Sequence, residues 1–405
     1  MRLLFSHNNY PAQFRRLVPA LIERGHEVAF LCRSREWHAP TVEGVRLLRF
    51  EPHRPGGGAA IHPYLRRFEE AVLQGQAAYR ALQPLAASGW APDWIINHVG
   101  FGNGLYLGDV FPEARRVGLF EWYYNAVDSD VDFLRRGPVE PDRQLKLRTW
   151  NAQVLLEFAG CHHAVTPTHW QQAQFPAHLR PHLQVIHEGI DVPLMAQLRT
   201  NPPPRPACLP PDPNLEILTY VSRGFEEYRG FPQAMRAIAE LQRRRPQLHA
   251  LIVGHDGVAY GANRSDGRGW GEWARQEVPL VPERTHWLGI LQDAEYHQVL
   301  AHSTVHLYLT VPFVLSWSLL EAMAAGCALV SSATAPVQEV LRDGHSALLV
   351  DFFDHDAQCQ ALERLLDRPE LRRQLAHQAQ IQAQGYSASA GLQAWLALLG
   401  QGMQT

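Results

Sequence analysis

The sequence has a single lysine, few cysteines and no long apolar run. Because Lys146 is the only lysine, a site that needs a fixed positive charge must nearly always use arginine. The five cysteines include no CxxC pair, and their number is odd. This argues against a structural zinc site and against a disulfide framework, and it favours a reducing compartment.

Long apolar segments and a strong net charge are also missing. No stretch approaches about 20 uninterrupted apolar residues, so we expect no transmembrane helix, and the apolar run at the N-terminus is too short for a signal peptide. A net charge of −3 gives no field that would draw the chain to nucleic acid. We therefore expect a cytoplasmic protein without a nucleic-acid partner. A peripheral membrane contact and the oligomeric state stay open.

What is present is the composition of a globular protein. Hydrophobic residues make up 46% of the chain and charged residues 19%, which suits large buried cores and argues against intrinsic disorder. A length of 405 residues predicts two domains or slightly more.

Short apolar runs alternate with amphipathic helical patterns, which is typical of parallel sheets with crossover helices. The chain opens with strand patterns at Arg2–Ser6 and Glu27–Cys32, and a helix from about Pro11 to Arg24 lies between them. Further strands of the first half are expected at 94–97, 116–120, 163–165 and 183–186. In the second half, strands are expected at 217–221, 249–253, 285–288, 305–309, 328–331 and 347–350, and helices at 231–243, 293–302 and 318–325.

A proline-rich stretch separates the two halves. Residues 200–213 contain seven prolines, which excludes a continuing helix or a central strand. We therefore predict an α/β fold of two Rossmann-like, doubly wound domains that face each other across a cleft. The expected boundaries are 1–190 for the N-terminal domain, 191–214 for a connector and 215–385 for the C-terminal domain. A final helix over 386–405 could pack back on the N-terminal domain.

Doubly wound folds bind ligands at the carboxyl ends of their strands, and one motif follows a predicted strand there. The run PFVLSWSLLEAMAAG, Pro312–Gly326, places Glu321 in the first turns of a helix. The free N–H groups at a helix N-terminus favour an anion such as a diphosphate, and a carboxylate just inside can accept hydrogen bonds from a ribose diol. The alternative is that Glu321 only favours the helix dipole.

A second motif directly follows the first strand of the back half. VSRGFEEYRG, Val221–Gly230, carries Arg223 and Arg229. Arginine can bind phosphate bidentately, and preorganised cations stabilise charge that develops on a leaving group. The alternative is a solvated loop with two surface arginines.

Both motifs resemble the donor-binding segments of the retaining family 4 glycosyltransferases, which have the GT-B fold. The resemblance implies that Glu321 holds the nucleotide ribose, and that Arg223 and Arg229 hold the donor diphosphate. His98, which ends the strand pattern DWIINH, matches a His that reaches the donor sugar; a packed, satisfied histidine is the alternative. Phe313 departs from the family, because it stands where a Glu contacts the donor sugar.

The same resemblance implies further contacts with both substrates. Donor-side positions are Gly224, Gly254, Gly289, Ile290, Leu291, Val314, Leu315 and Ser316. Acceptor-side candidates are Asn8, Asn9, Tyr10 and Glu121. Glu121 lies in FEWYYN, which could equally be an aromatic edge of the core. No carboxylate cluster predicts a metal site, and the implied small molecule is a co-substrate, a UDP- or GDP-type sugar, with no separate cofactor.

The sequence thus predicts a retaining, metal-independent glycosyltransferase, by resemblance a hexosyltransferase, that moves a sugar from a nucleotide-diphosphate sugar to an acceptor. The acceptor, whether a glycan, a lipid-linked compound or a small molecule, is not identified. Two alternatives stay open: another GT-B enzyme such as a nucleotide-sugar epimerase or hydrolase, and a non-catalytic scaffold that binds sugar nucleotides.

Overall fold

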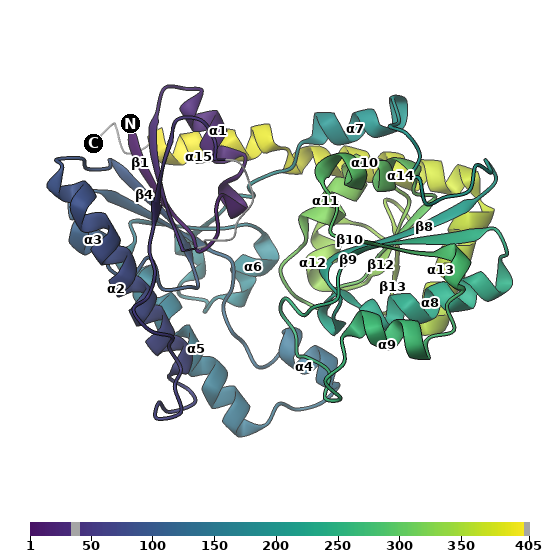
Figure 1. Cartoon of the computed structure of the whole chain (residues 1–405), viewed down its shortest axis with the longest axis horizontal. Helices are drawn as coiled ribbons and strands as arrows, with labels where there is room; N and C mark the ends of the chain where they lie inside the picture. The colour runs from purple at the N-terminus through teal and green to yellow at the C-terminus, as the bar shows by residue number, and fades with distance from the viewer. Residues whose placement is uncertain (34–40, 401–405) are drawn as a thin grey trace. The chain divides into compact units, whose positions relative to one another are not determined.

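The computed structural model describes residues 1–33 and 41–400. The chain divides into two compact units, which Figure 1 shows in one view. Unit 1 contains Met1–Gly189 and the helix that begins at Ala388, and unit 2 is Ile190–Ser387. Each unit is built on one parallel sheet, which confirms the predicted α/β class with two doubly wound sheets.

Unit 1 has a seven-stranded sheet in the order β3-β2-β1-β4-β5-β6-β7. Its strands are β1 (Arg2–Ser6), β2 (Glu27–Cys32), β3 (Val45–Arg49), β4 (Trp94–Val99), β5 (Arg115–Phe120), β6 (His163–Thr166) and β7 (Leu183–Val185). The short apolar runs of the sequence form these strands because both faces of the sheet are covered. Along β1, Leu3 and Phe5 point into one core and Leu4 into the other.

Helices cover both faces of the unit 1 sheet. The helices are α1 (Leu17–Ile22), α2 (Arg66–Ala87), α3 (Leu107–Val110), α4 (Asp130–Arg135), α5 (Pro141–Gly160), α6 (His169–Gln174) and α15 (Ala388–Gly400), with 3-10 turns η1 (Ala12–Phe14) and η2 (Arg180–His182). Helices α1 and α15 pack on the face that carries Phe5, and α2 and α3 pack on the face that carries Leu4. The last residues of the segment predicted as a C-terminal helix, 401–405, lie outside the described residues.

Unit 2 has a six-stranded sheet in the order β10-β9-β8-β11-β12-β13. Its strands are β8 (Glu216–Gly224), β9 (Leu248–His255), β10 (Thr285–Gly289), β11 (Val305–Tyr308), β12 (Leu329–Ser332) and β13 (Leu348–Val350). The strand order reverses between β8 and β11. Ligands of doubly wound folds bind outside the carboxyl ends of the strands at such a switch point.

The helices of unit 2 also form two layers (Figure 1). They are α7 (Val192–Thr200), α8 (Phe231–Arg244), α9 (Trp270–Glu277), α10 (Asp293–His302), α11 (Trp317–Ala324), α12 (Ala335–Val340), α13 (His355–Asp367) and α14 (Pro369–Ala383), with 3-10 turns η3 (Glu227–Arg229), η4 (Pro282–Arg284) and η5 (Gln384–Tyr386). One layer holds α7, α10, α11 and α14, and the other holds α8, α9 and α13.

The first part of the segment predicted as a connector, 191–214, is a helix. Helix α7 begins there, capped by the Asp191 side chain, which accepts a hydrogen bond from the backbone N of Leu194. Val192 and Met195 pack into the core beneath α11. The helix ends where the prolines begin, because proline cannot continue it. Among the described residues, no helix is long and apolar enough to cross a membrane.

Candidate functional site

The main cluster of predicted site residues lies in unit 2, around the switch point between β8 and β11. Strand β8 ends at Gly224, and η3 then brings Arg229 to the sheet edge. Strand β11 ends at Tyr308, and the segment after it leads into α11. The two motifs that the sequence singled out therefore meet at one end of the sheet.

Arg229 is buried, with 7% of its surface exposed, and its guanidinium is fixed by three hydrogen bonds. Nη1 donates to the Tyr308 hydroxyl at 3.2 Å and to Thr310 Oγ1 at 2.9 Å, and Nη2 donates to the Val314 carbonyl at 3.0 Å. A guanidinium has five N–H donors. Two donors, Nε–H and one Nη2–H, therefore make no hydrogen bond with the described residues.

The charge of Arg229 is maintained in this buried position. Burial alone would lower its pKa, but the neighbouring Tyr308, Tyr260, Glu226 and Tyr220 outweigh burial, and the pKa of Arg229 is raised. The two remaining donors thus belong to a permanent cation, which is the type of group that binds a phosphate oxygen.

Two aromatic side chains lie against this guanidinium, and a third packs on one of them. The Tyr260 and Phe313 rings lie 5.5 and 5.8 Å from the Arg229 guanidinium carbon. Phe313 packs on Tyr260 at a centroid distance of 5.0 Å and edge-on to Tyr228 at 5.2 Å. Phe313, which replaces the carboxylate expected from the resemblance, is therefore part of an aromatic cover over Arg229.

Arg223, the other predicted cation, lies in a different environment. It is exposed near the end of β8, and its guanidinium makes no hydrogen bond or ion pair with the described residues. Its backbone carbonyl lies 2.5 Å from His255 Nδ1. Arg223 can therefore reorient toward a ligand, whereas Arg229 is fixed in place.

Glycines allow the backbone to pack closely at this edge. A Cβ on Gly224 would lie 2.3 Å from the Gly257 carbonyl oxygen, and a Cβ on Gly254, which has φ +140°, would lie 2.3 Å from the Ser222 carbonyl oxygen. Gly224 and Gly254, two of the three predicted donor-side glycines, therefore occupy positions where any other residue would clash.

Glu321 lies in the second turn of α11 and is buried, with 7% of its surface exposed. The Tyr296 hydroxyl of α10 donates a hydrogen bond to Glu321 Oε2 at 3.1 Å. The N-cap of α11 is Ser316, whose side chain accepts a hydrogen bond from Ser318 N and whose own N–H donates to the Tyr308 hydroxyl at 3.1 Å. Leu315 is buried in the core. Tyr308 thus joins the α11 N-terminus to Arg229 through one hydroxyl.

The predicted nucleobase segment follows β10. Gly289 has φ +67°, which glycine adopts without strain. Ile290 is 75% exposed, more than any other large apolar side chain among the described residues, and Leu291 packs partly against the core. An exposed apolar side chain beside such a turn is suited to contact a planar ring.

Unit 1 has a second cluster at the carboxyl ends of β1, β4 and β5. His98 Nε2 lies 3.0 Å from Glu121 Oε2, which is close enough for an ion pair. The angles at the two atoms do not meet the geometry of a hydrogen bond. Gln13 Nε2 donates to Glu121 Oε1 at 2.8 Å. The rings of His7 and Phe101 contact His98, at centroid distances of 4.5 and 5.3 Å. Two sequence candidates, His98 and Glu121, are thus brought together.

The environment keeps Glu121 ionised. Burial acts to raise the pKa of Glu121, but the neighbouring His98, the hydrogen bond from Gln13 and the charge of His187 together hold it below its ordinary value. A carboxylate acceptor with fixed partners is suited to bind a hydroxyl donor.

A buried polar network beneath this cluster was not identified from the sequence. Glu157 of α5 accepts hydrogen bonds from Asn97 Nδ2 and Gln153 Nε2, both at 2.5 Å. Burial raises the pKa of Glu157 to about 7 despite these hydrogen bonds and the neighbouring His98. A Cβ on Gly104 would lie 2.0 Å from Asn97 Nδ2, so the glycine-rich loop after β4 must pack directly on this network. The strand that ends in His98 was identified from the sequence, but its buried partner on α5 was not.

The three acceptor-side candidates in the loop after β1 lie in different environments. Asn8 and Asn9 are half-buried, and Asn9 N donates to His7 Nδ1 at 2.8 Å. Tyr10 is 3% exposed, packs on Phe30, and accepts a hydrogen bond from the backbone N of Val42. Because its ring and hydroxyl serve the core, we do not carry Tyr10 into the acceptor site proposed below.

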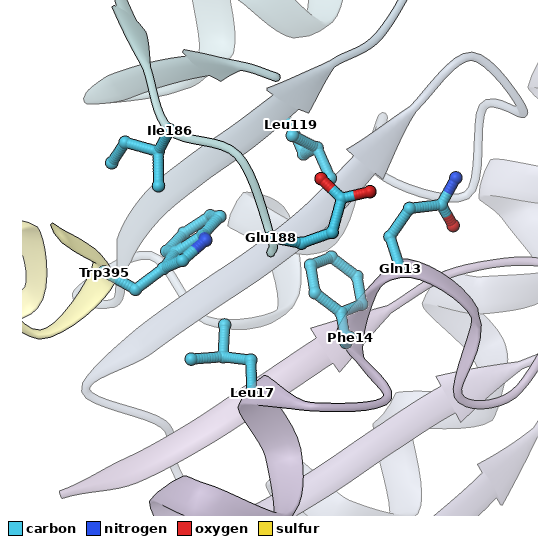
Figure 2. Close-up of a pocket in the computed structure, with 7 residues that line it drawn as sticks. All are labelled: Gln13, Phe14, Leu17, Leu119, Ile186, Glu188 and Trp395. Atoms are coloured by element: carbon cyan, nitrogen blue, oxygen red, sulfur yellow. The ribbon is translucent and has the colours of Figure 1, made fainter. Parts of the chain in front are cut away.

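A small pocket lies beside the second cluster, within unit 1 (Figure 2). It is mostly apolar, with the polar side chains of Gln13 and Glu188 on its wall. The lining residues are Gln13, Phe14, Leu17, Leu119, Ile186, Glu188 and Trp395. Gln13 links the pocket to Glu121 through its hydrogen bond. In the described ranges, no group of three or more His, Cys, Asp or Glu side chains is arranged to hold a metal ion.

Comparison with protein families finds one match in each half of the chain. The family described as Glycosyl transferase family 4 group matches residues 24–195, and the family described as Glycosyl transferases group 1 matches residues 208–382. Together they cover most of both units. Comparison with curated protein sequences finds no match.

Solved structures with the same architecture are glycosyltransferases of low sequence identity. Sucrose-phosphate synthase from Thermosynechococcus elongatus has a TM-score of 0.72 at 19% identity, over 100% of this chain and 99% of that chain. Alr3699/HepE from Anabaena, in complex with UDP and glucose, gives 0.68 at 16%, over 99% and 100%. The α,α-trehalose-phosphate synthase (UDP-forming) from Burkholderia vietnamiensis gives 0.68 at 15%, over 99% and 98%.

At these sequence identities, the structural similarity shows only that the fold is shared. The family matches are the evidence for glycosyltransferase activity. The chain is therefore a GT-B glycosyltransferase, with a family 4 type N-terminal domain and a group 1 C-terminal domain.

Proposed function

We propose that the chain is a retaining, metal-independent glycosyltransferase that moves a hexosyl group from a UDP- or GDP-sugar to an acceptor bound by unit 1. The observation that carries this proposal is the state of Arg229. It is a buried cation at the switch point of the sheet, held by three hydrogen bonds, with two N–H donors left over. A preorganised cation of this kind stabilises charge that grows on a leaving diphosphate.

Two further residues support the donor half of the proposal. Arg223 is exposed on the adjoining strand end and supplies a second, mobile cation. Glu321 offers a buried carboxylate, already oriented by Tyr296, that can accept hydrogen bonds from a ribose diol. With two arginines to neutralise the diphosphate, the reaction does not require a metal ion for that purpose.

The proposed reaction needs no protein nucleophile. The bond from the anomeric carbon to the diphosphate oxygen breaks, and the acceptor oxygen bonds to the same carbon on the same face of the sugar. The acceptor's proton passes to the leaving phosphate oxygen. The protein then contributes position and electrostatics. On the acceptor side, Glu121 and His98 are the groups that we assign to binding a hydroxyl.

UDP-glucose is the first donor to test, because Alr3699/HepE is described in complex with UDP-glucose and the trehalose-phosphate synthase is described as UDP-forming. Thermal unfolding with UDP, GDP and ADP would identify the nucleotide. A ligand at 100 times its Kd stabilises a protein by about 2.7 kcal/mol. We expect UDP or GDP to give a clear rise in Tm.

The stereochemistry and the metal requirement need separate measurements. NMR of the product formed from an α-linked donor should show an α-linkage, and an inverted linkage would disprove the retaining mechanism. Transfer should continue in a chelator such as EDTA. Loss of activity in EDTA with recovery on adding Mg²⁺ would disprove metal independence, and release of free sugar without any transfer would favour the hydrolase alternative.

A further inference from the structure

We propose that Tyr260 is part of the donor site, where its ring covers the Arg229 guanidinium and keeps water from the bound diphosphate. Glu226 is the positioning residue, because it fixes the backbone that carries Tyr260. This role rests on the proposed function of Arg229 as a diphosphate-binding residue. The proposal adds to the donor site a residue from the segment between β9 and α9, which lies outside the two motifs identified in the sequence.

Glu226 holds the backbone of this segment from inside the protein. Its side chain is 0% exposed, and Oε2 accepts hydrogen bonds from the backbone N of Tyr260 at 2.9 Å and of Gly261 at 2.7 Å. Oε1 is also buried and has no hydrogen-bond partner among the described residues. Leaving a buried carboxylate oxygen without a partner costs free energy. A buried carboxylate oxygen without a hydrogen-bond partner is rare in folded proteins and needs an explanation, such as a role in a functional site.

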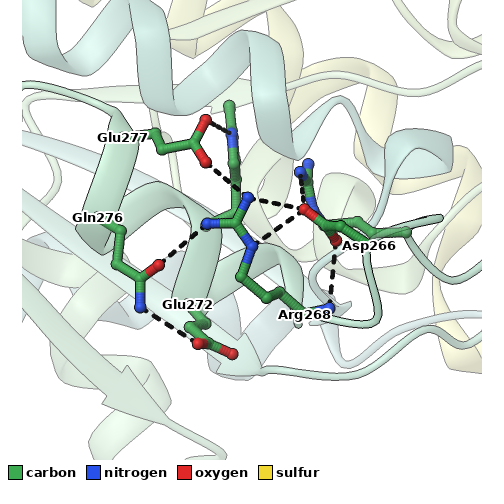
Figure 3. A network of polar contacts seen from close by, with 7 residues as sticks. Asp266, Arg268, Glu272, Gln276 and Glu277 are labelled. Atoms are coloured by element: carbon green, nitrogen blue, oxygen red, sulfur yellow. Dashed lines mark hydrogen bonds and ion pairs between the residues drawn. The ribbon is translucent and has the colours of Figure 1, made fainter.

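The rest of the segment is anchored at its other end. Arg264 and Arg268 both donate to Asp266, and Arg268 also forms an ion pair with Glu277 of α9 (Figure 3). Asp256 accepts hydrogen bonds from the first backbone N–H groups of α9, at 2.7 and 2.8 Å. With both ends fixed, the segment 257–269 can hold one side chain in a defined place.

Tyr260 itself is held there by its backbone and not by its hydroxyl. The hydroxyl makes no hydrogen bond with the described residues, and the side chain is 44% exposed. The ring nevertheless lies 5.5 Å from the guanidinium carbon of Arg229. Rings pack against the face of a guanidinium, whereas its hydrogen bonds leave from the edges. Because the Tyr260 hydroxyl makes no hydrogen bond with Arg229, the ring contact leaves the two remaining N–H donors for phosphate.

The expected consequence is control over which nucleophile reaches the sugar. Excluding water strengthens the interaction between Arg229 and the diphosphate. It also slows the side reaction in which water attacks the anomeric carbon, the bond to the diphosphate breaks, the sugar leaves with a new hydroxyl, and the proton of the water passes to the diphosphate. Tyr260 should therefore raise nucleotide affinity and suppress hydrolysis.

The test uses the full chain with UDP and UDP-glucose as probes. We compare Tyr260→Ala and Tyr260→Phe with a matched control, Asn263→Ala, which changes an exposed side chain of the same segment. Tyr260→Ala should weaken UDP binding roughly 3- to 30-fold, the range of a partly desolvated cation–π contact. It should also increase the release of glucose from saturating UDP-glucose without acceptor. Asn263→Ala should behave like the natural protein, and Tyr260→Phe, which keeps the ring, should lose less UDP affinity than Tyr260→Ala.

The positioning role of Glu226 is tested by measuring how mobile the segment 257–269 becomes when Glu226 is replaced. Glu226→Ala should reproduce the Tyr260→Ala effects and speed trypsin cleavage after Arg264 and Arg268. Glu226→Gln keeps an amide oxygen that can accept both hydrogen bonds, so it should bind UDP nearly as the natural protein does. Were Glu226→Ala not to fold, the Tyr260 variants and Glu226→Gln would still decide the question.

The outcomes separate this inference from the function on which it rests. Unchanged UDP affinity and unchanged glucose release in Tyr260→Ala, together with a lowered rate in Arg223→Ala, would overturn the role of Tyr260 and leave the proposed function standing. Faster glucose release in Asn263→Ala would overturn it too, because the effect would not belong to the ring. Failure of the natural protein to bind UDP or UDP-glucose would overturn both.

Discussion

His98 Nε2 and Glu121 Oε2 lie 3.0 Å apart at the carboxyl edge of the unit 1 sheet, although 23 positions of sequence separate them. The pairing follows from strand order, because β4 and β5 are parallel neighbours whose ends meet at the same edge. It places an imidazole beside a carboxylate whose pKa is held below its ordinary value.

We predict that Glu121→Gln impairs sugar transfer and leaves the nucleotide site intact. The amide keeps the shape of the side chain and can still contact Gln13, but it removes the charge that would bind an acceptor hydroxyl. Losing a charged acceptor costs about 1.5–3 kcal/mol, so acceptor KM should rise by one to two orders of magnitude. Calorimetry should give an unchanged Kd for UDP. A Kd that rises as much as the acceptor KM would contradict the assignment of Glu121 to the acceptor side.

Glu321→Ala should weaken nucleoside diphosphate binding. A ribose diol that loses a buried carboxylate acceptor loses about 1.5–3 kcal/mol. Tyr296→Phe is the matched variant, because it removes only the hydroxyl that donates to Glu321, and it should have a smaller effect. The measurement is calorimetric titration with UDP. Equal affinity in the natural protein and Glu321→Ala would refute the ribose-binding role.

Arg223 and Arg229 should differ in how much they contribute to the stability of the protein, although both support the reaction. Arg223→Ala and Arg229→Ala should each lower kcat by about 10² to 10³, the usual loss for a preorganised donor at a developing charge. Only Arg229→Ala should also lower Tm, because it removes three buried hydrogen bonds, to Tyr308, Thr310 and the Val314 carbonyl. Comparing kcat with thermal unfolding separates these effects. A loss of Tm in Arg223→Ala would show that its exposed side chain has a structural role.

Stability should fall as pH rises because of Glu157. Its pKa is raised from 4.5 to about 7 in the folded protein. Between these values the folded protein holds a proton that the unfolded chain has released, so the free energy of unfolding decreases with rising pH and levels off above about 7. At about 1.4 kcal/mol per pKa unit, the total is of the order of 3 kcal/mol. The titratable group that acts on Glu157 here is His98.

Denaturant unfolding between pH 5 and 8 tests this expectation. Glu157→Gln should remove most of the slope, and Glu140→Gln, which changes an exposed carboxylate just before the same helix, should keep it. The same slope in Glu157→Gln and the natural protein would assign the pH dependence to other groups.

The positions of most strands along the chain, though not that of β3, and the two motifs at the switch point could be predicted from the sequence because both depend on local pattern. Buried parallel strands such as β1 and β9 are short apolar runs, and the motifs around Arg223, Arg229 and Glu321 each lie within one strand–turn–helix segment. Helices α2 and α5 were not predicted. Helix α2 contains Gly75 and Pro84, and α5 exposes Leu155 and Leu156, so neither has a clean amphipathic period.

The tertiary structure alone decided which residues complete each site. Glu157 reaches Asn97 across 60 positions of sequence, and Tyr260 lies over Arg229 although its own segment carries no motif. Such contacts arise where loops from different strands meet at one sheet edge, and no local periodicity encodes that meeting. The sequence therefore determined the sheets and the cations of the proposed donor site, whereas packing determined which N–H groups of Arg229 are already hydrogen-bonded and which side chain lies over them.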